Sequence, residues 1–423
     1  MRWIGFLLLL TQVSNCLAIT RPDDSFLDDV EHRSFLYFWE QADSATGLIR
    51  DRARNDGRSS LGVSSDIASI AATGFGLTGI CIAAERHWIT QEQARERIRL
   101  TLHFLAERAV SSHGFYYHWM TTSTGERRWG SEFSSIDTAL LMGGILTVRQ
   151  RYANDREIMQ LADFIYTRVD FTWMLNGDSL LLSHGWRPET GFIVYRWDSY
   201  SELMLLYLLG IGSPTHPIPP DSWYAWARPK MDYHGYSYVG EAPLFTYQYS
   251  QAWVDFRNRK DAPPSDLDYF ENSIMATRAH QAFCMRLQNR FPLSFGPECC
   301  WGITASDSPN GYMIWGGPPP NSHLDGTVVP CAPGGSLMFA PDICIPALKA
   351  MIARYGEKIY GHYGFADAFN PTTGWFDPEV VGIDAGITML SAENLRGGTV
   401  WRWFMKNPSI TQAMRLAKFR PTR

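Results

Sequence analysis

The 423-residue sequence lacks a basic cluster long enough to grip phosphates, and its formal net charge is −5. This charge removes the electrostatic basis for nucleic-acid binding. Beyond its first residues, the chain also lacks a run of about 18 apolar residues, the length of a membrane helix. The motifs G-x-x-x-x-G-K-[ST], H-E-x-x-H and G-x-S-x-G are missing too. We therefore expect no nucleic-acid partner, no transmembrane segment, and none of the chemistries that these motifs carry.

The N-terminus has the pattern of an export signal. Arg2 precedes the apolar run "WIGFLLLL", and Ala18 is a small residue before a plausible cleavage site. We predict a signal peptide over residues 1–18 and an exported protein, periplasmic or extracellular. The stretch "VSNC" also resembles a bacterial lipobox, with Cys16 as the lipidated residue, although Asn15 stands where a small residue is expected. No proline-rich linker or charge run follows, so residues 19–423 are expected to form one domain.

Six cysteines remain after the predicted signal, an even number that an oxidising compartment could pair. They are Cys81, Cys284, Cys299, Cys300, Cys331 and Cys344. Six cysteines allow 15 pairings, so the connectivity stays open. Cys81 lies in the apolar segment "GLTGICIAAER", where a buried, inert thiol is expected. No C-x-x-C pair occurs, and we expect no metal site and no cofactor.

Hydrophobic periodicity predicts an all-α protein. Some segments, such as "DIASIAATGFGLTGICIAAE", are apolar on nearly every side, whereas "TQEQARERIRLTLHFLAERA" has a wide charged face. Helices of the first kind are buried and those of the second lie outside, so the alternation predicts a closed ring of helical hairpins. One short β-hairpin is expected around "RPETG". The predicted helices are 28–43, 65–87, 90–110, 134–153, 155–175, 200–211, 220–228, 245–255, 268–288, 342–355, 384–405 and 408–418.

A pattern recurs four times: an aromatic segment, an x-Thr-Gly turn, a loop, and an acidic residue at the opening of an apolar helix. The turns end at Gly47, Gly125, Gly191 and Gly374, and the acids are Asp66, Asp137, Glu202 and Asp384. If the inner helices of the ring run parallel, all four acids gather at one rim. Asp66 follows its turn at a longer distance than the others and could be a simple helix cap.

Glu202 allows two interpretations. Ser199 and Glu202 fit an S-x-x-E capping box, in which the glutamate only caps a helix. The alternative is a cleft acid, because caps do not explain the aromatic loops before each acid. Paired carboxyls in an aromatic cleft suit glycosidic cleavage, where one protonates the leaving oxygen and the other activates water or attacks carbon. Trp197 and Tyr200 could desolvate Glu202, and Asp198 could orient it or bind sugar.

Further residues are predicted to contact a sugar. Trp129, Glu132, Tyr117 and His118 are expected to line the cleft, with buried packing roles as the alternative. Tyr249 and Gln251 could contact sugar hydroxyls or form a satisfied polar pair. Asp307 in "ASDSPNGY" is a candidate substrate contact or turn residue; a calcium loop is disfavoured because Pro309 replaces the next ligand of the EF-hand pattern. The loop "NSHLDGTVVPCAPGGSL" could close over a ligand through His323 and Asp325.

Several ordered motifs carry a resemblance from about Phe35 to Phe419. They include "FLYFWEQADSATGLIRDR", "SSIDTALLMGG", "WDSYSE", "QYSQAWVDFRNRKD", "WGITASDSPNGY" and "GIDAGITMLSAENLR". Together they resemble the glucoamylase-like bacterial family that includes the endo-β-1,2-glucanases of glycoside hydrolase family 144. The resemblance implies an (α/α)6 barrel with short β-hairpins on the active-site rim. It also implies export and inverting hydrolysis of β-1,2-glucan to sophoro-oligosaccharides without a cofactor.

The same resemblance implies residue roles. Glu202 in "WDSYSE" would be the general acid, and Asp137 and Asp384 would be acids at the cleft. Related domains transglycosylate with retention, so a β-1,2-glucan transglycosylase is an alternative. Two others are a non-catalytic carbohydrate-binding toroid and a polysaccharide lyase, although an acidic protein would attract a uronate chain poorly. We expect a monomer whose partner is a glucan polysaccharide or oligosaccharide.

Overall fold

The computed structural model describes residues 19–58, 65–296, 300–318 and 323–422. The predicted signal peptide, with Cys16, and Cys299 lie outside these ranges. Within them, no helix is long and apolar enough to cross a membrane.

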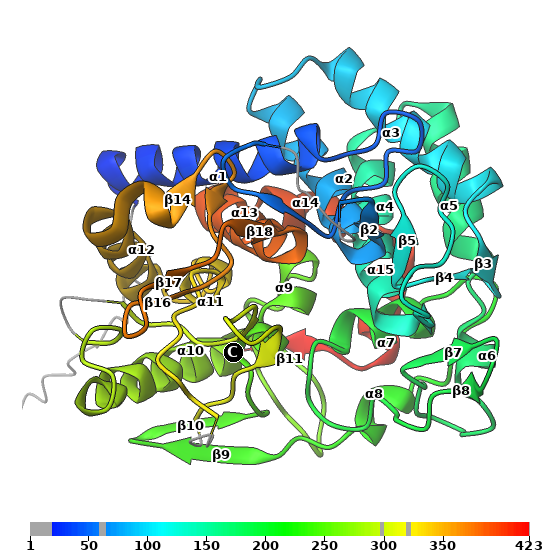
Figure 1. The fold of residues 1–423 in the computed structure, drawn as a ribbon. Helices are drawn as coiled ribbons and strands as arrows, with labels where there is room; N and C mark the ends of the chain where they lie inside the picture. The colour runs from blue at the N-terminus through cyan, green and yellow to red at the C-terminus, as the bar shows by residue number, and fades with distance from the viewer. Residues whose placement is uncertain (1–18, 59–64, 297–299, 319–322, 423) are drawn as a thin grey trace, which may run out of the picture.

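The described chain folds as a ring of helical hairpins (Figure 1). The outer helices are α1 (Arg21–Glu40), α3 (Gln91–Glu107), α5 (Arg156–Thr167), α8 (Ser222–Ala225), α10 (Tyr269–Arg286) and α12 (Pro341–Tyr355). Between them in sequence come the inner helices α2 (Ile70–Glu85), α4 (Ser135–Arg151), α7 (Met204–Ile211), α9 (Tyr249–Trp253), α11 (Cys331–Gly335) and α13 (Gly382–Gly397). Helix α2 packs against α4 and α13, α4 against α7, α7 against α9, and α11 against α13. The predicted (α/α)6 barrel is confirmed.

Shorter helical segments complete the fold. They are α6 (Phe171–Met174), α14 (Thr399–Phe404), α15 (Pro408–Leu416) and the 3-10 turns η1 (Leu244–Tyr247), η2 (Leu287–Asn289) and η3 (Gly356–Lys358). One hydrophobic core cluster extends from Leu27 to Ala417.

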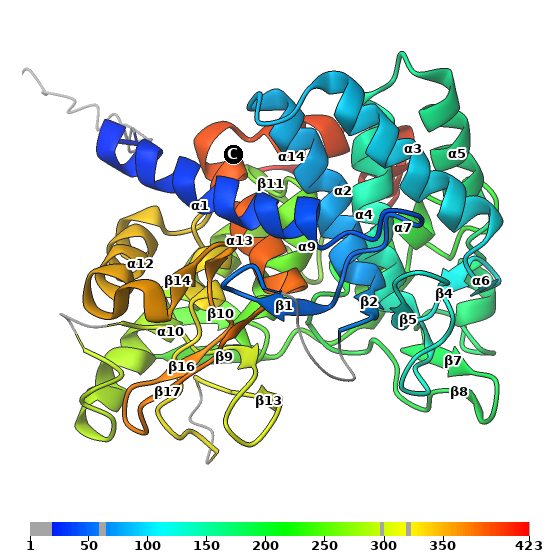
Figure 2. The ribbon, with the colours of Figure 1, turned by 45° about the horizontal axis from the view of Figure 1, so that its top comes forward.

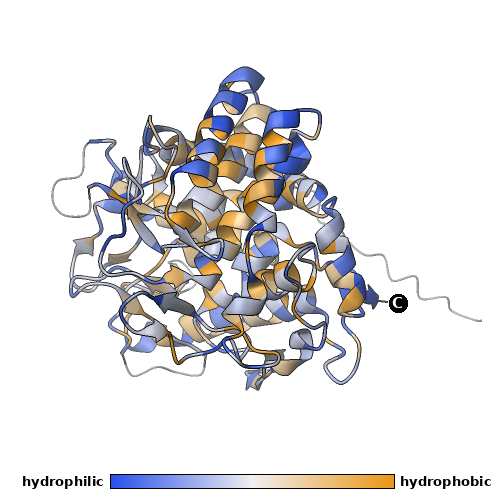
Figure 3. Ribbon diagram, turned by 90° about the vertical axis from the view of Figure 1, so that its right-hand side faces the viewer, coloured by the Kyte–Doolittle hydropathy of each residue, from blue (hydrophilic) through white to orange (hydrophobic). Residues whose placement is uncertain are grey.

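Burial follows the predicted alternation. Every residue of α2 from Ile70 to Ala84 is buried, whereas α3 keeps a charged outer face. In Figure 3, which is coloured by hydropathy, the interior helices are mainly orange (hydrophobic), whereas the outer helices carry more blue (hydrophilic) residues. Helices α2 and α4 approach closely because Gly74 lies at their contact: a Cβ atom there would stand 2.3 Å from the Leu140 carbonyl oxygen.

Short strands form the rim. They are β1 (Arg52–Arg54), β2 (Ile67–Ser69), β3 (Ser111–Ser112), β4 (Phe115–Tyr116), β5 (Trp119–Thr121), β6 (Phe133–Ser134), β7 (Gly185–Arg187), β8 (Gly191–Phe192), β9 (Lys230–Tyr233), β10 (Tyr236–Val239), β11 (Arg259–Lys260), β12 (Ala305–Ser306), β13 (Met313–Ile314), β14 (Tyr360–Gly361), β15 (Gly364–Phe365), β16 (Phe369–Asn370), β17 (Trp375–Phe376), β18 (Glu379–Val381) and β19 (Arg420–Pro421).

All the strand pairings are antiparallel, and several join distant parts of the chain. Strand β1 pairs with β18, as Figure 2 shows, β2 with β5, β6 with β7, and β11 with β19. The predicted hairpin around "RPETG" is confirmed as β7–β8. Five of the pairings in the described chain join close neighbours in hairpins that the sequence did not predict: β3–β4, β9–β10, β12–β13, β14–β15 and β16–β17. The pairings β1–β18, β2–β5 and β6–β7 connect loops that lead into the inner helices α2, α4 and α13.

Several predicted helix limits are wrong. The segment 65–87 begins as β2, so its helix starts only at Ile70, and 155–175 divides into α5 and α6. The segment 384–405 divides at Gly398, whose φ of 61° is left-handed and ends α13. Helix α11 was missed because "CAPGG" contains proline and two glycines, which are poor helix formers. The four predicted x-Thr-Gly turns are confirmed, since each glycine has φ between 72° and 78°.

Four of the cysteines that the structure describes take no part in the disulfide framework that the even number allowed. Cys81, Cys284, Cys331 and Cys344 are buried free thiols. Burial raises the pKa of the Cys81 thiol, which agrees with the predicted inert role.

Candidate active site

A cavity of about 430 Å³ opens where the inner helices begin. Its walls come from the first turns of α2, α4 and α13, from the segment before α7, and from rim strands β1 and β5. The parallel inner helices therefore bring their N-terminal ends to one rim, as predicted. The lining residues are Asp51, Arg52, Ser69, Ala71, His118, Trp119, Trp129, Ile136, Asp137, Leu140, Glu202, Phe245, Tyr249, Tyr312, Val381 and Ile383.

Glu202 lines this cavity and does not form the capping box. Helix α7 starts at Met204, and its cap residue, Leu203, makes no side-chain capping bond. The Glu202 carbonyl oxygen accepts a hydrogen bond from Ser250 Oγ at 2.5 Å, which fixes the backbone and leaves the carboxyl facing the cavity. Burial raises the pKa of Glu202 to about 7, and the charge of Asp137 adds to this rise.

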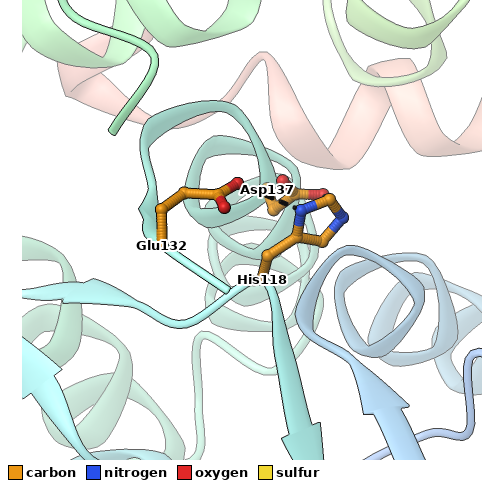
Figure 4. A group of neighbouring side chains, drawn as sticks. All are labelled: His118, Glu132 and Asp137. Carbon is orange, nitrogen blue, oxygen red and sulfur yellow. Dashed lines mark hydrogen bonds and ion pairs between the residues drawn. The ribbon is translucent and has the colours of Figure 1, made fainter. Parts of the chain in front are cut away.

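Asp137 lies in the first turn of α4, with His118 beside it (Figure 4). His118 Nε2 stands 3.4 Å from Asp137 Oδ1, and His118 Nδ1 stands 3.2 Å from Glu132 Oε1. Ser134 Oγ donates to Asp137 Oδ2 at 2.6 Å. Because both ring nitrogens face carboxylates, the imidazole satisfies both only when it is protonated. Glu132 supports the site from behind the cavity wall.

The pKa values of this group agree with its geometry. Burial alone would lower the pKa of His118, but the charges of Asp137 and Glu132 outweigh burial and raise it. Burial likewise opposes the ionised form of Glu132, yet the hydrogen bond and charge of His118 lower its pKa to about 2. The group is thus a bound ion triad with a cationic centre.

Asp384 is also in the first turn of its helix, α13, but it lies behind the cavity wall. It lines a separate small pocket with Asp367 and Cys331. Tyr249, which does line the cavity, donates its hydroxyl to Asp384 Oδ1 at 3.4 Å. Burial raises the pKa of Asp384, although hydrogen bonds from Asp367 and Cys331 oppose the rise.

The expectation that Asp66 joins the other three acids is wrong. Asp66 precedes β2, four residues before α2 begins, and its side chain pairs with Arg128 Nη2 at 3.3 Å. The predicted helix start lies beside Asp66 because the apolar pattern continues without a break from β2 into α2.

Aromatic rings form part of the cavity wall. Trp129 is 50% exposed and packs edge-on against Trp119, with ring centroids 5.3 Å apart. Trp119 stacks on His118 and donates its indole N–H to Asp51 Oδ1 at 3.1 Å. Tyr312, which is 52% exposed, also lines the cavity. Exposed, fixed rings of this kind suit stacking on sugar faces.

Several predicted contacts lie away from the cavity. Tyr117 is buried against Phe133, with ring centroids 3.8 Å apart. Trp197 is buried and donates its indole N–H to Ser135 Oγ, while Tyr200 packs in an aromatic core. Trp197 and Tyr200 therefore do not line the cavity beside Glu202, although the sequence suggested that they would.

Two polar candidates are also placed away from the cavity wall. Asp198 is exposed on a turn. Gln251 is fully buried and donates to Ser273 Oγ and the Tyr269 carbonyl, but its Oε1 has no partner among the described residues, so it does not form the fully satisfied polar pair of the alternative interpretation. His323 and Asp325 do not line the cavity either.

Sequence reasoning missed Asp51 and Arg52. Arg52 lines the cavity, donates to Asp51 Oδ2 at 3.1 Å, and pairs with Asp307. Asp307 therefore supports the wall through Arg52 and is not itself a lining residue. The "RDR" at the end of the first recurring turn was the available signal, because it precedes β1 at the rim.

Comparison with known proteins follows this geometry. A family model described as "Putative glucoamylase" matches residues 194–408. The chain belongs to this glucoamylase-like family. A curated relative from Parabacteroides distasonis, an exo-β-1,2-glucooligosaccharide sophorohydrolase (non-reducing end), is 30% identical over 94% of this chain. The chain spans 58% of the length of that relative.

Two solved structures of glucoamylase-like relatives extend the comparison. An endo-β-1,2-glucanase from Chitinophaga pinensis, in complex with sophorotriose and glucose, is 29% identical, with a TM-score of 0.84. The alignment covers 94% of this chain and 98% of that one. A β-1,2-glucanase from Parabacteroides distasonis is 27% identical with the same TM-score, and the alignment covers 94% of this chain and 60% of that one.

Proposed function

We propose that the protein is an exported glycoside hydrolase that cleaves β-1,2-glucan to sophoro-oligosaccharides. The observation that carries this proposal is Glu202, which lines the same cavity as Asp137 and whose pKa burial raises to about 7. A protonated and an ionised carboxyl in one cleft are what glycosidic cleavage requires. The printed activities of the β-1,2-glucan-cleaving relatives support the choice of linkage.

In the proposed mechanism, Glu202 is the general acid. Its proton passes to the glycosidic oxygen as the bond to the anomeric carbon breaks, so the leaving sugar departs as a neutral hydroxyl. No cation pairs with Glu202 among the described residues, and burial keeps the group protonated without such a partner.

Asp137 is the candidate base. It lines the cavity, and His118 and Ser134 fix its orientation, so it can accept a proton from the attacking water. Attack by this water on the face opposite the leaving group inverts the anomeric carbon. Asp384 acts from behind the wall, where it positions Tyr249.

The substrate groove is formed by the exposed rings and the cationic side chain of the wall. Trp129 and Tyr312 offer faces for sugar rings, and Arg52 offers guanidinium donors to hydroxyls. These groups are consistent with a neutral glucan as the bound partner.

The test uses Glu202→Gln, with Glu271→Gln as the matched control, because Glu271 lies exposed on α10 far from the cavity. Both variants and the wild-type protein are incubated with linear β-1,2-glucan, and products are separated by chromatography. We expect Glu202→Gln to lose at least about 100-fold in kcat/KM, in the range of general-acid removal, and the control to match wild type. β-1,3-Glucan, starch and a uronate polymer serve as substrate controls.

NMR of the first product anomer separates the remaining alternatives. Inversion agrees with Asp137 as base, whereas retention with longer products would establish transglycosylation. If wild type and both variants bind glucan without turnover, the protein is better described as a carbohydrate-binding toroid. Undiminished activity in Glu202→Gln would contradict the assignment of Glu202 as the general acid.

A further inference from the structure

A second group of carboxyls lies beside the cavity and takes no part in the mechanism above. Asp307, Asp367 and Asp377 each offer an oxygen atom, and these three atoms lie within 4.8 Å of one another. Asp307 follows β12, Asp367 lies between β15 and β16, and Asp377 lies between β17 and β18. Three separate rim loops therefore meet at this point.

Two of these carboxyls are deeply buried and only half satisfied. Asp367 is 2% exposed and Asp377 5% exposed. Asp367 Oδ2 accepts the Asp307 N–H at 2.6 Å, and Asp377 Oδ1 accepts the Glu379 N–H at 2.9 Å. The second oxygens, Asp367 Oδ1 and Asp377 Oδ2, accept no hydrogen bond from the described residues, and Asp367 is set against the Asp384 carboxyl instead of a donor. A buried carboxylate oxygen without a donor is costly, which points to a missing partner at this place.

The surrounding charge does not supply that partner. Within the described chain, the ion pair made to this group is the one between Arg52 and Asp307, and Arg52 also pairs with Asp51. Asp367 faces a further carboxyl, that of Asp384. One shared guanidinium cannot neutralise this many acids.

We propose that Asp307, Asp367 and Asp377 bind a divalent cation at the rim, with Ca²⁺ as the best-fitting ion. All the ligand atoms are carboxylate oxygens, which hard cations prefer. Ca²⁺ accepts carboxylate ligands in a flexible geometry, whereas Mg²⁺ demands a near-octahedral geometry and usually keeps several waters, so a cluster of buried carboxylates from three loops favours Ca²⁺. The ligands come from three loops, so Pro309, which excludes an EF-hand pattern, does not obstruct the site. The sequence alone had led us to expect no metal.

Such a cation would fix one wall of the cavity. Asp307 begins the loop that leads through the Ser308–Gly311 turn to Tyr312, and Tyr312 lines the cavity. A cation shared with Asp367 and Asp377 would hold this loop against the β15–β18 region. The site is independent of the proposed glucan hydrolysis, since it can be measured without a substrate.

The test measures cation binding by the purified, chelator-treated protein. Calorimetric titration with CaCl2 is expected to show one site with a dissociation constant of about 0.1 mM or tighter. Asp377→Asn should weaken binding at least about tenfold, as loss of a direct ligand requires. Asp221→Asn is the matched control, because Asp221 is an exposed aspartate without a side-chain capping bond.

A thermal unfolding series checks the same site independently. Added CaCl2 should raise the Tm of wild type and of Asp221→Asn, and should raise the Tm of Asp377→Asn by clearly less. Absence of calcium binding up to about 10 mM, well above the usual range, would overturn the proposal. Equal binding by Asp377→Asn would also overturn it, and tighter binding of MgCl2 would overturn the choice of ion.

Discussion

Two acidic groups at the same rim behave in opposite ways. Glu132 and Asp137 hold His118 between them, and the pKa of Glu132 is lowered to about 2. Asp367 and Asp377 have oxygens without donors, and burial raises the pKa of Asp377 to about 7. The difference lies in the partner: His118 stands between the two carboxyls of the first group, whereas the second group has, within the described chain, only the Arg52 guanidinium on Asp307, shared with Asp51.

Glu202 belongs with the second kind. No cation pairs with it among the described residues, and burial raises its pKa to about 7, like that of Asp377. Burial without a cation thus produces a proton donor at Glu202 and an unsatisfied cluster at Asp377. Burial of a carboxyl therefore favours proton donation at Glu202, whereas at Asp377 it leaves an oxygen atom that a bound cation could satisfy.

The largest expected effect comes from removing the cation of the first group. His118→Asn leaves the buried Asp137 without its cationic neighbour and leaves Glu132, among the described residues, with only the ion pair to Arg187 Nη2 at 3.5 Å. Breaking such a set costs roughly 3 kcal/mol of unfolding free energy. Loss of the fixed Asp137 position should lower kcat/KM on β-1,2-glucan about 100-fold. Denaturant unfolding and initial rates measure the two effects.

His87→Asn is the matched control, because His87 is exposed and asparagine tolerates its positive φ. It should leave both quantities unchanged. If His118→Asn keeps wild-type activity, Asp137 does not need the His118 cation for catalysis. The proposed difference between the two acidic groups would then be wrong.

A smaller effect is expected from pH. Glu202 must carry its proton to act as the general acid, so kcat/KM should fall as pH rises through about 7, the pKa of this carboxyl. Above that value the decline should approach about tenfold per pH unit. Rates over pH 4 to 10 on β-1,2-glucan provide the profile. A flat profile up to pH 9 would contradict the assignment of Glu202 as the acid.

The ring of hairpins was predictable because burial follows local periodicity. Helices apolar all round, such as α2, must lie inside, and amphipathic ones outside. The short inner helices α9 and α11 carried too few residues for a clear period, and α11 contains proline and glycine. Helices α9 and α11 depend on tertiary packing, and a local sequence pattern does not reveal such packing.

The site was predictable only in part. Asp137 and Glu202 follow turn-and-loop patterns that repeat along the chain, so their convergence could be inferred. Trp197 and Tyr200 are neighbours of Glu202 in sequence, yet their rings turn into the core. The cluster of Asp307, Asp367 and Asp377 joins three loops, and no spacing in the sequence records such a meeting.

The smallest expected effect concerns the stability of this second group. The pKa of Asp377 in the fold is about 7, above the ordinary value of 3.8, so its ionised form destabilises the folded state. The stability present below pH 3.8 is lost as pH rises towards 7. In a chelator at pH 8, the free energy of unfolding of Asp377→Asn should therefore exceed that of wild type, and at pH 4 the two values should be nearly the same.

The same pair of proteins in CaCl2 sharpens the comparison. A bound cation would stabilise the ionised form of Asp377, as His118 stabilises that of Glu132. Wild type should therefore recover its stability at pH 8. The difference in unfolding free energy in favour of Asp377→Asn should shrink or reverse. Asp221→Asn should follow wild type in both buffers. If wild type is the more stable protein at pH 8 even in chelator, the charge of Asp377 is already satisfied by the fold, and the two acidic groups differ less than their contacts imply.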